Sequence, residues 1–174
     1  MKTLSHLDER GRVRMVDVSD KPETRREAVA RGRVTMQPAT LRLLRSGRAR
    51  KGDVLTTAHL AAVNAAKRTG EWIPLAHPLR LDGVDVTFGF ATRPAAVTIE
   101  CRVTTTGRTG VEMEALTAVA AAGLTLMDML KAADRTLTIH DVALWEKRGG
   151  RSGTWVRPRG RTAQPRPRAT RRTR

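Results

Sequence analysis

Two alternating runs of apolar residues, separated by a short connection, constrain the fold of this chain more than any other feature. The runs cover residues 84–90 and 97–103, and every second side chain in each is apolar. Successive side chains of a strand point to opposite faces, so each run predicts a strand with one apolar face. The connection at residues 91–94 is short enough for a hairpin. The apolar positions are Val84, Val86, Phe88, Phe90, Val97, Ile99, Cys101 and Val103.

Helical patterns stand on both sides of this hairpin. Asp53 is expected to cap a helix that runs to about Thr69 and that Gly70 ends. Residues 111–133, rich in Ala, Leu and Met, predict one long helix. The other expected elements are a pairing segment at 15–18, a strand at 27–36, a short helix opening at Pro38 and a strand or strand pair at 137–144.

This order of elements indicates an α+β fold, a mainly antiparallel sheet with helices packed on one face. Aromatic residues make up only 3% of the chain, so Ala, Leu and Val must fill the core and the helices must pack closely. We expect a loosely ordered N-terminal segment at 1–14, one folded domain at 15–156, and a disordered Arg/Pro-rich basic tail at 157–174.

The formal charge is +16, and the tail supplies half of it through eight arginines and no acid. A basic protein attracts anions, so nucleic acid and a small polyphosphate are both candidate ligands. A non-catalytic nucleic-acid-binding module is therefore one alternative. The chain has no Tyr, only two Phe and no helix-turn-helix pattern, which disfavours that alternative, and the tail is expected to bind polyanions only weakly.

Cysteine and apolar content bear on compartment and cofactors. Cys101 is the only cysteine, so neither an internal disulfide nor a Cys-rich zinc site is expected. The four histidines show no ligand spacing, and we predict no metal and no cofactor. No uninterrupted apolar run approaches the ~18 residues of a membrane span. A cytoplasmic protein without a membrane segment is the expectation.

Three charged residues are candidates for acid–base chemistry or anion binding. Lys51 stands just ahead of the helix start capped by Asp53, where its charge adds to the partial positive charge of the helix end. Asp128 and Lys131 are three residues apart on the long helix and project side by side among apolar neighbours. The alternatives are a solvated lysine and a structural ion pair.

Three further segments are candidates for ligand contact. His77 is restricted by Pro78, which favours a directed imidazole, although a packed structural histidine is equally compatible. Glu112 and Glu114 open the long helix and either serve its dipole or bind amino groups of a nucleotide. Lys147 begins a glycine-rich basic loop that is able to wrap an anion but lacks Walker spacing.

The length of the predicted helix limits how these residues combine. Glu114 and Asp128 are 14 residues apart, so they share a helix face but stand about 21 Å apart along the axis. One small-molecule pocket does not hold both from one continuous helix. Either Gly123 breaks the helix or a second subunit completes the pocket, and we favour the second subunit.

Several short segments occur in a fixed order along the chain. They are Met-Val-Asp-Val-Ser at 15–19, Lys-Gly-Asp-Val at 51–54, Ile-Pro-Leu-Ala-His-Pro-Leu at 73–79, Thr-Gly-Val-Glu-Met-Glu-Ala-Leu-Thr at 109–117 and Met-Asp-Met-Leu-Lys-Ala at 127–132. In this order they resemble the MoaC family of cyclic pyranopterin monophosphate synthases. The resemblance covers about residues 4–155.

The resemblance implies a ferredoxin-like α+β fold and a homohexamer built as a trimer of dimers. It also implies a lyase of molybdenum cofactor biosynthesis, which converts 3′,8-cyclo-7,8-dihydro-GTP to cyclic pyranopterin monophosphate and releases pyrophosphate. A radical SAM partner enzyme supplies that substrate. The resemblance implies catalytic roles for Asp128, Lys131 and Lys51, and substrate binding by Leu75, Ala76, His77, Glu112, Met113, Glu114 and Lys147.

The chain departs from the family pattern at four positions. Ala76 stands where Cys is usual, so a backbone contact survives but a thiol role does not. Met127 replaces a common aromatic residue. Arg148 and Arg151 stand where Ser and Lys are usual, which keeps the charge at 151 but not a proton-donating lysine.

Overall fold

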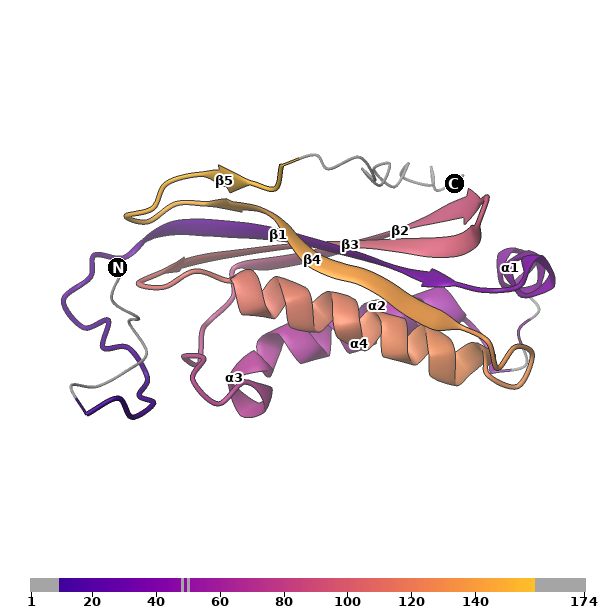
Figure 1. Cartoon of the computed structure of the whole chain (residues 1–174), viewed down its shortest axis with the longest axis horizontal. Coiled ribbons are helices and arrows are strands. Elements are labelled where there is room, and N and C mark those ends of the chain that lie inside the picture. The colour runs from indigo at the N-terminus through magenta and orange to yellow at the C-terminus, as the bar shows by residue number, and fades with distance from the viewer. Residues whose placement is uncertain (1–9, 48, 50, 159–174) are drawn as a thin grey trace.

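The computed structural model describes residues 10–47, 49 and 51–158 (Figure 1). These residues form one sheet with helices against it, an α+β arrangement consistent with a ferredoxin-like fold. In chain order the elements are β1 (Thr24–Thr35), α1 (Pro38–Arg45), α2 (Val54–Lys67), α3 (Thr69–Trp72), β2 (Gly83–Thr92), β3 (Ala95–Gly107), α4 (Glu112–Leu130), β4 (Thr138–Arg148) and β5 (Trp155–Val156).

The sheet has the strand order β2-β3-β1-β4-β5, and every pair of neighbours is antiparallel. The predicted hairpin is confirmed as β2 and β3, with Phe88 opposite Ile99. The predicted strand at 27–36 is confirmed as β1, which begins three residues earlier. The strand expected at 137–144 is confirmed as β4.

Helices α2 and α4 lie side by side on one face of the sheet (Figure 1). Small side chains allow this close packing, since Ala58 and Ala62 of α2 and Ala118 and Ala122 of α4 are completely buried. Gly32 lets β1 approach α4, because a Cβ there would stand 2.8 Å from Cγ1 of Val119. The predicted Ala-rich core with helices on one face is confirmed.

The start of α2 is as expected, but its end is not. Asp53 caps the helix, with its Oδ1 accepting a hydrogen bond from the Thr56 amide at 3.0 Å. Gly70 does not end it, because it lies within α3. The helix ends at Lys67 instead, and the hydroxyl of buried Thr69 donates to the carbonyl oxygens of Ala65 and Ala66. These bonds satisfy acceptors that the helix end leaves open.

Two terminal regions differ from expectation. The segment at 15–18 forms no strand, because Asp17 folds it into a local turn by accepting from the amide and hydroxyl of Ser19 at 2.9 and 2.7 Å. The short strand β5 pairs with β4 and was not predicted. The predictions for residues 1–9 and 159–174 lie outside the described residues.

Among the described residues, α4 is the one helix long and apolar enough to cross a membrane. More than half of its apolar window is buried inside the fold. The same apolar character is what a helix at the centre of a core requires, and α4 packs against α2, β1, β3 and β4.

Candidate active site

Lys51, Asp128 and Lys131 meet at the C-terminal end of α4. Lys131 Nζ lies 2.6 Å from Asp128 Oδ1, as the three-residue spacing predicts. Lys51 Nζ lies 2.9 Å from the other carboxylate oxygen and donates to the Asp128 carbonyl oxygen at 2.9 Å. Lys51 reaches this point because it precedes α2, which packs against α4. The three predicted catalytic residues thus form one cluster, here called the Asp128 cluster.

The two lysines determine the charge state of this cluster. Hydrogen bonds from Lys131 and then Lys51, with the positive charge of both, lower the pKa of Asp128 to about 2. Its carboxyl is therefore ionised at neutral pH. The side chain is about half exposed, so the cluster is open to a ligand.

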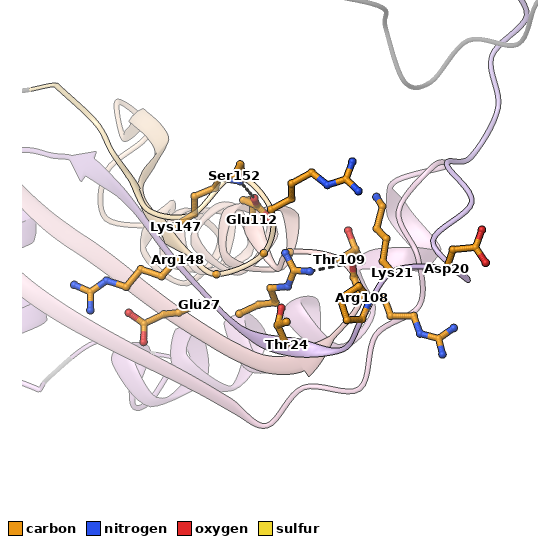
Figure 2. Close-up of a pocket in the computed structure, with 16 residues that line it drawn as sticks. Asp20, Lys21, Thr24, Glu27, Arg108, Thr109, Glu112, Lys147, Arg148 and Ser152 are labelled. Carbon is orange, nitrogen blue, oxygen red and sulfur yellow. Dashed lines mark hydrogen bonds and ion pairs between the residues drawn. The ribbon is translucent and has the colours of Figure 1, made fainter.

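Lys147 and Glu112 meet at the opposite end of α4. Lys147 lies on β4, and its Nζ stands 3.3 Å from Glu112 Oε1 and donates to Ser152 Oγ at 2.6 Å (Figure 2). Glu112 is the first residue of α4, and Ser152 belongs to the glycine-rich loop after β4. The lysine and the loop predicted to bind an anion therefore lie beside the start of the long helix.

A cavity of about 300 Å³ adjoins this helix start. Its walls come from the two-proline segment before β2, from the first turn of α4 and from the N-terminal segment around Val16 and Val18. Six of the seven predicted substrate-binding residues line it, namely Leu75, Ala76, His77, Glu112, Met113 and Glu114. The seventh, Lys147, pairs with Glu112 at its edge.

Glu114 is the least exposed ionisable residue of this cavity, at 4%. Burial, opposed by a backbone hydrogen bond and aided by the charge of Glu112, raises the pKa of its carboxyl to about 7. A carboxyl with this pKa is able to take up or release a proton at neutral pH.

A continuous α4 separates the two groups of predicted residues. Gly123 does not break the helix; it makes room for Ile139, whose Cδ1 would stand 3.2 Å from a Cβ at that position. A break at Gly123 is therefore excluded. Within one chain, Glu114 and Asp128 remain about 21 Å apart along the helix axis.

A second, larger cavity of about 640 Å³ lies next to the first and shares Lys21, Thr109, Gly110 and Glu112 with it. Its lining includes Lys147 of the predicted set, but also Arg26 and Arg108, which sequence reasoning missed. Figure 2 labels Lys147 and Arg108 in this lining. Arg26 lies within a strand, where alternation alone does not distinguish a ligand-facing arginine from a surface one. Arg108 follows Gly107 and lies two residues before Gly110, and glycines allow the backbone to approach a ligand closely, so these two glycines were the available signal.

Among residues 10–47, 49 and 51–158, no three His, Cys, Asp or Glu side chains are grouped so as to hold a metal ion. The charged side chains of the two cavities and the Asp128 cluster are mostly lysines and arginines, and the carboxylates of Glu112 and Asp128 are paired with lysines. Such a set suits a phosphorylated ligand that carries hydrogen-bond donors.

Comparison with known proteins gives the family. The MoaC family model matches residues 15–150. A cyclic pyranopterin monophosphate synthase of Thermomicrobium roseum is 61% identical over 157 residues, which cover 90% of this chain and 95% of the relative. The synthase of Heliobacterium modesticaldum is 57% identical, and the match covers 90% of this chain and 99% of the relative. A cyclic pyranopterin monophosphate synthase 1 of Mycobacterium tuberculosis is 56% identical, and the match covers 88% of this chain and 90% of the relative. The chain belongs to the MoaC family.

Proposed function

We propose that the two ends of α4 contribute to one composite active site, each end coming from a different subunit of a cyclic pyranopterin monophosphate synthase. As a MoaC-family protein the chain is a lyase of molybdenum cofactor biosynthesis, acting on 3′,8-cyclo-7,8-dihydro-GTP and releasing pyrophosphate. One observation carries the proposal: the implied site residues form two groups at opposite ends of an unbroken helix.

The cavity beside His77 suits the purine-derived part of the substrate. It combines apolar wall residues, such as Leu75 and Leu79, with the carboxyls of Glu112 and Glu114. Carboxylate oxygens accept hydrogen bonds from ring and exocyclic N–H groups, which a guanine-derived ring carries. Ala76 lines the same cavity, and a contact through its backbone does not need the thiol that is usual in the family.

The Asp128 cluster supplies the acid–base chemistry in this proposal. Ring opening and reclosure require a group that accepts a proton and one that donates it. Asp128 is ionised beside two lysines, so it is assigned the acceptor role, and Lys131 is assigned the donor role. A substrate phosphate that draws a lysine away from Asp128 would raise the carboxyl pKa and allow the proton to be returned.

Expulsion of pyrophosphate requires cationic groups. A substrate hydroxyl oxygen forms a bond to the α-phosphorus while the P–O bond to the β-phosphate breaks. The electron pair leaves with pyrophosphate, and the hydroxyl proton passes to a base. Lys51 and Lys147 are the lysines proposed to stabilise the negative charge that develops.

A homohexamer arranged as a trimer of dimers accounts for the composite site, since each dimer interface would bring the two groups together. We further propose a cytoplasmic enzyme that receives its substrate from a radical SAM enzyme. The basic tail is proposed to add weak, salt-sensitive affinity for polyanions.

Mixing of inactive variants tests the composite site directly. Asp128→Ala and Lys147→Ala are each expected to abolish product formation. Subunits of the two variants, mixed equally and reassembled, should recover about a quarter of the wild-type rate, because a quarter of composite sites then contain both intact halves. A mixture of Asp128→Ala with Lys51→Ala, two changes in the same half, is the control and should stay inactive.

Two results would contradict the proposal. Recovery in the control mixture as well would show that the halves are wrongly assigned. No recovery in the first mixture, with subunit exchange demonstrated by mass spectrometry, would show that each active site belongs to one chain.

A further inference from the structure

We propose that an extra residue in β4, Trp145, aims Lys147 at the start of α4, and that Arg31 holds Trp145 in place. Both are positioning residues, since they act on the site through Lys147 and neither lines the two cavities. The inference rests on the proposed function, which assigns Lys147 to the active site. It adds the reason why the strand presents this side chain to α4.

The pairing of β4 with β1 determines which face of the sheet each β4 side chain takes. Paired residues share a face, and successive residues of a strand alternate between faces. Ala28 of β1 belongs to the core under α2 and α4, so its partner Lys147 lies on the helix-covered face (Figure 1). Ala30 belongs to the same core and places its partner Leu144 on that face too.

A regular strand does not put residues 144 and 147 on one face, because they are three positions apart. Neighbouring residues of β1 pair with residues 144 and 146 of β4, so Trp145 is an extra residue in this ladder. Such a β-bulge shifts the alternation by one position. In a regular ladder, Glu146 would take the face on which Glu112 lies, and Lys147 would point to the opposite, outer face.

The ring of Trp145 is held by Arg31. The guanidinium carbon of Arg31 lies 4.6 Å from the centroid of the ring, which is a cation–π contact. Arg31 Nε also lies 2.6 Å from Glu100 Oε2, and the arginine is only 9% exposed. Because the ion pair and burial restrict Arg31, its guanidinium is a fixed surface for the ring.

The backbone of the bulge has a partner of its own. An extra residue is left out of the ladder, so its carbonyl group needs a hydrogen-bond donor from elsewhere. The amide of Arg157 donates to the Trp145 carbonyl oxygen, and Nε of Arg157 donates to the Leu144 carbonyl oxygen, both at 2.8 Å. Both the ring and the carbonyl group of Trp145 are therefore held, and the bulge has one defined geometry.

The contacts of Lys147 depend on this geometry. Its Nζ stands 3.3 Å from Glu112 Oε1 and donates to Ser152 Oγ at 2.6 Å. From the outer face, the sheet itself would separate Lys147 from Glu112. Loss of the contact between Arg31 and Trp145 makes the regular ladder relatively more favourable, so Lys147 would leave Glu112 more often.

The test is acetylation of lysines in the full-length protein, resolved by residue with mass spectrometry, together with steady-state pyrophosphate release. Trp145→Ala and Arg31→Ala should each raise the acetylation rate of Lys147 about fivefold, the effect expected for loss of one cation–π contact. Lys51, in the Asp128 cluster, should react at its wild-type rate in both variants. Both variants should also lower kcat/KM about tenfold, because Lys147 is misplaced.

Two further variants serve as controls. Trp145→Phe keeps an aromatic face for Arg31 and should restore both measurements to within about twofold of wild type. Trp72→Ala is the matched control, because it removes the same ring from α3, outside the sheet, where Trp72 is 55% exposed. It should change neither the acetylation rate of Lys147 nor kcat/KM.

The outcomes separate this inference from the proposed function. An unchanged acetylation rate of Lys147 in Trp145→Ala and Arg31→Ala would overturn the inference, whatever the activity. Equal increases at Lys147 and Lys51 would overturn it as well, because they would reflect a general loosening of the fold. A selective increase at Lys147 with normal kcat/KM would support the positioning and overturn the assignment of Lys147 to the active site. If Trp145→Ala does not fold, the comparison of Arg31→Ala with Trp145→Phe decides in the same terms.

Discussion

The carboxylate of Asp134 accepts a hydrogen bond from the backbone amide of Gln37 at 2.8 Å, across 97 positions of the sequence. Gln37 precedes α1 and has no side-chain cap of its own, so Asp134 serves as the cap from the loop after α4. The same carboxylate accepts from Thr40 and from the amide and hydroxyl of Thr136. One side chain therefore joins the start of α1, the end of α4 and the approach to β4.

This junction predicts acid-sensitive stability. Burial acts to raise the pKa of Asp134, but the hydrogen bonds from Gln37, Thr136 and Thr40 outweigh it and lower the pKa to about 2. A depressed folded-state pKa stabilises the fold above the unfolded value, and this stabilisation is lost as the pH falls from about 4 to about 2. Asp134→Ala should lower the free energy of unfolding by about 2 kcal/mol at pH 7, measured by urea denaturation.

The control for Asp134 is a comparison at low pH. The difference between wild type and Asp134→Ala should shrink as the wild-type carboxyl becomes protonated. A difference that stays the same from pH 7 down to pH 2.5 would mean that the ionised carboxylate does not hold the junction.

For Glu114 we predict the opposite dependence of stability on pH. Its folded-state pKa is raised to about 7 by burial and by the charge of Glu112. The folded chain then binds more protons than the unfolded chain between about pH 4.5 and 7, so this residue lowers stability as the pH rises through that range. Glu114→Gln should remove this loss and stabilise the unliganded protein by on the order of 2 kcal/mol at pH 8.

The measurement for Glu114 is the melting temperature of both proteins as a function of pH. The two curves should converge near pH 4 and separate above pH 6. Glu112→Gln is the comparison variant, since Glu112 is more exposed and pairs with Lys147. Parallel curves for wild type and Glu114→Gln would contradict the raised pKa.

Local patterns predicted most of the fold because the interactions that form it are local. The alternating apolar residues predicted strands β2 and β3. The position of Asp53 just before α2 predicted that it caps this helix, as it does. The segment at 15–18 was mispredicted because a side-chain bond from Ser19 to Asp17 competes with strand pairing. The end of α2 was misplaced for a similar reason, since the Thr69 hydroxyl closes the helix before Gly70.

The contacts of the site could be predicted from the sequence only where they are local. The contact of Asp128 with Lys131 follows from helix geometry. The contact of Asp128 with Lys51 spans 77 positions and requires knowing how α2 packs on α4, so only the family resemblance indicated it. The contacts of Arg26 with the Gly107 carbonyl oxygen and with Gly150 depend on how distant segments pack around β1, which neither periodicity nor spacing encodes.

Because Ala76 stands where Cys is usual in the family, we predict that this protein does not need a thiol at that position for activity. The residue lines the smaller cavity, and its backbone direction is set by the prolines on either side of the segment. Ala76→Cys should therefore change kcat/KM less than twofold in a pyrophosphate-release assay, whereas His77→Ala should reduce it at least tenfold. A large gain on introducing the thiol would show that the position acts through its side chain.

Gly150 provides the sharpest test of the glycine-rich loop, because Gly153 in the same loop is its natural control. Both have positive φ, +71° and +61°, so alanine costs each about 1 kcal/mol of backbone strain. They differ in surroundings: a Cβ at Gly150 would overlap the Arg26 guanidinium, whereas a Cβ at Gly153 would meet nothing within 4 Å. Gly150→Ala should raise KM about tenfold and Gly153→Ala less than twofold, measured by steady-state pyrophosphate release. Equal effects of the two substitutions would mean that backbone strain, rather than the contact of the loop with Arg26, controls substrate binding.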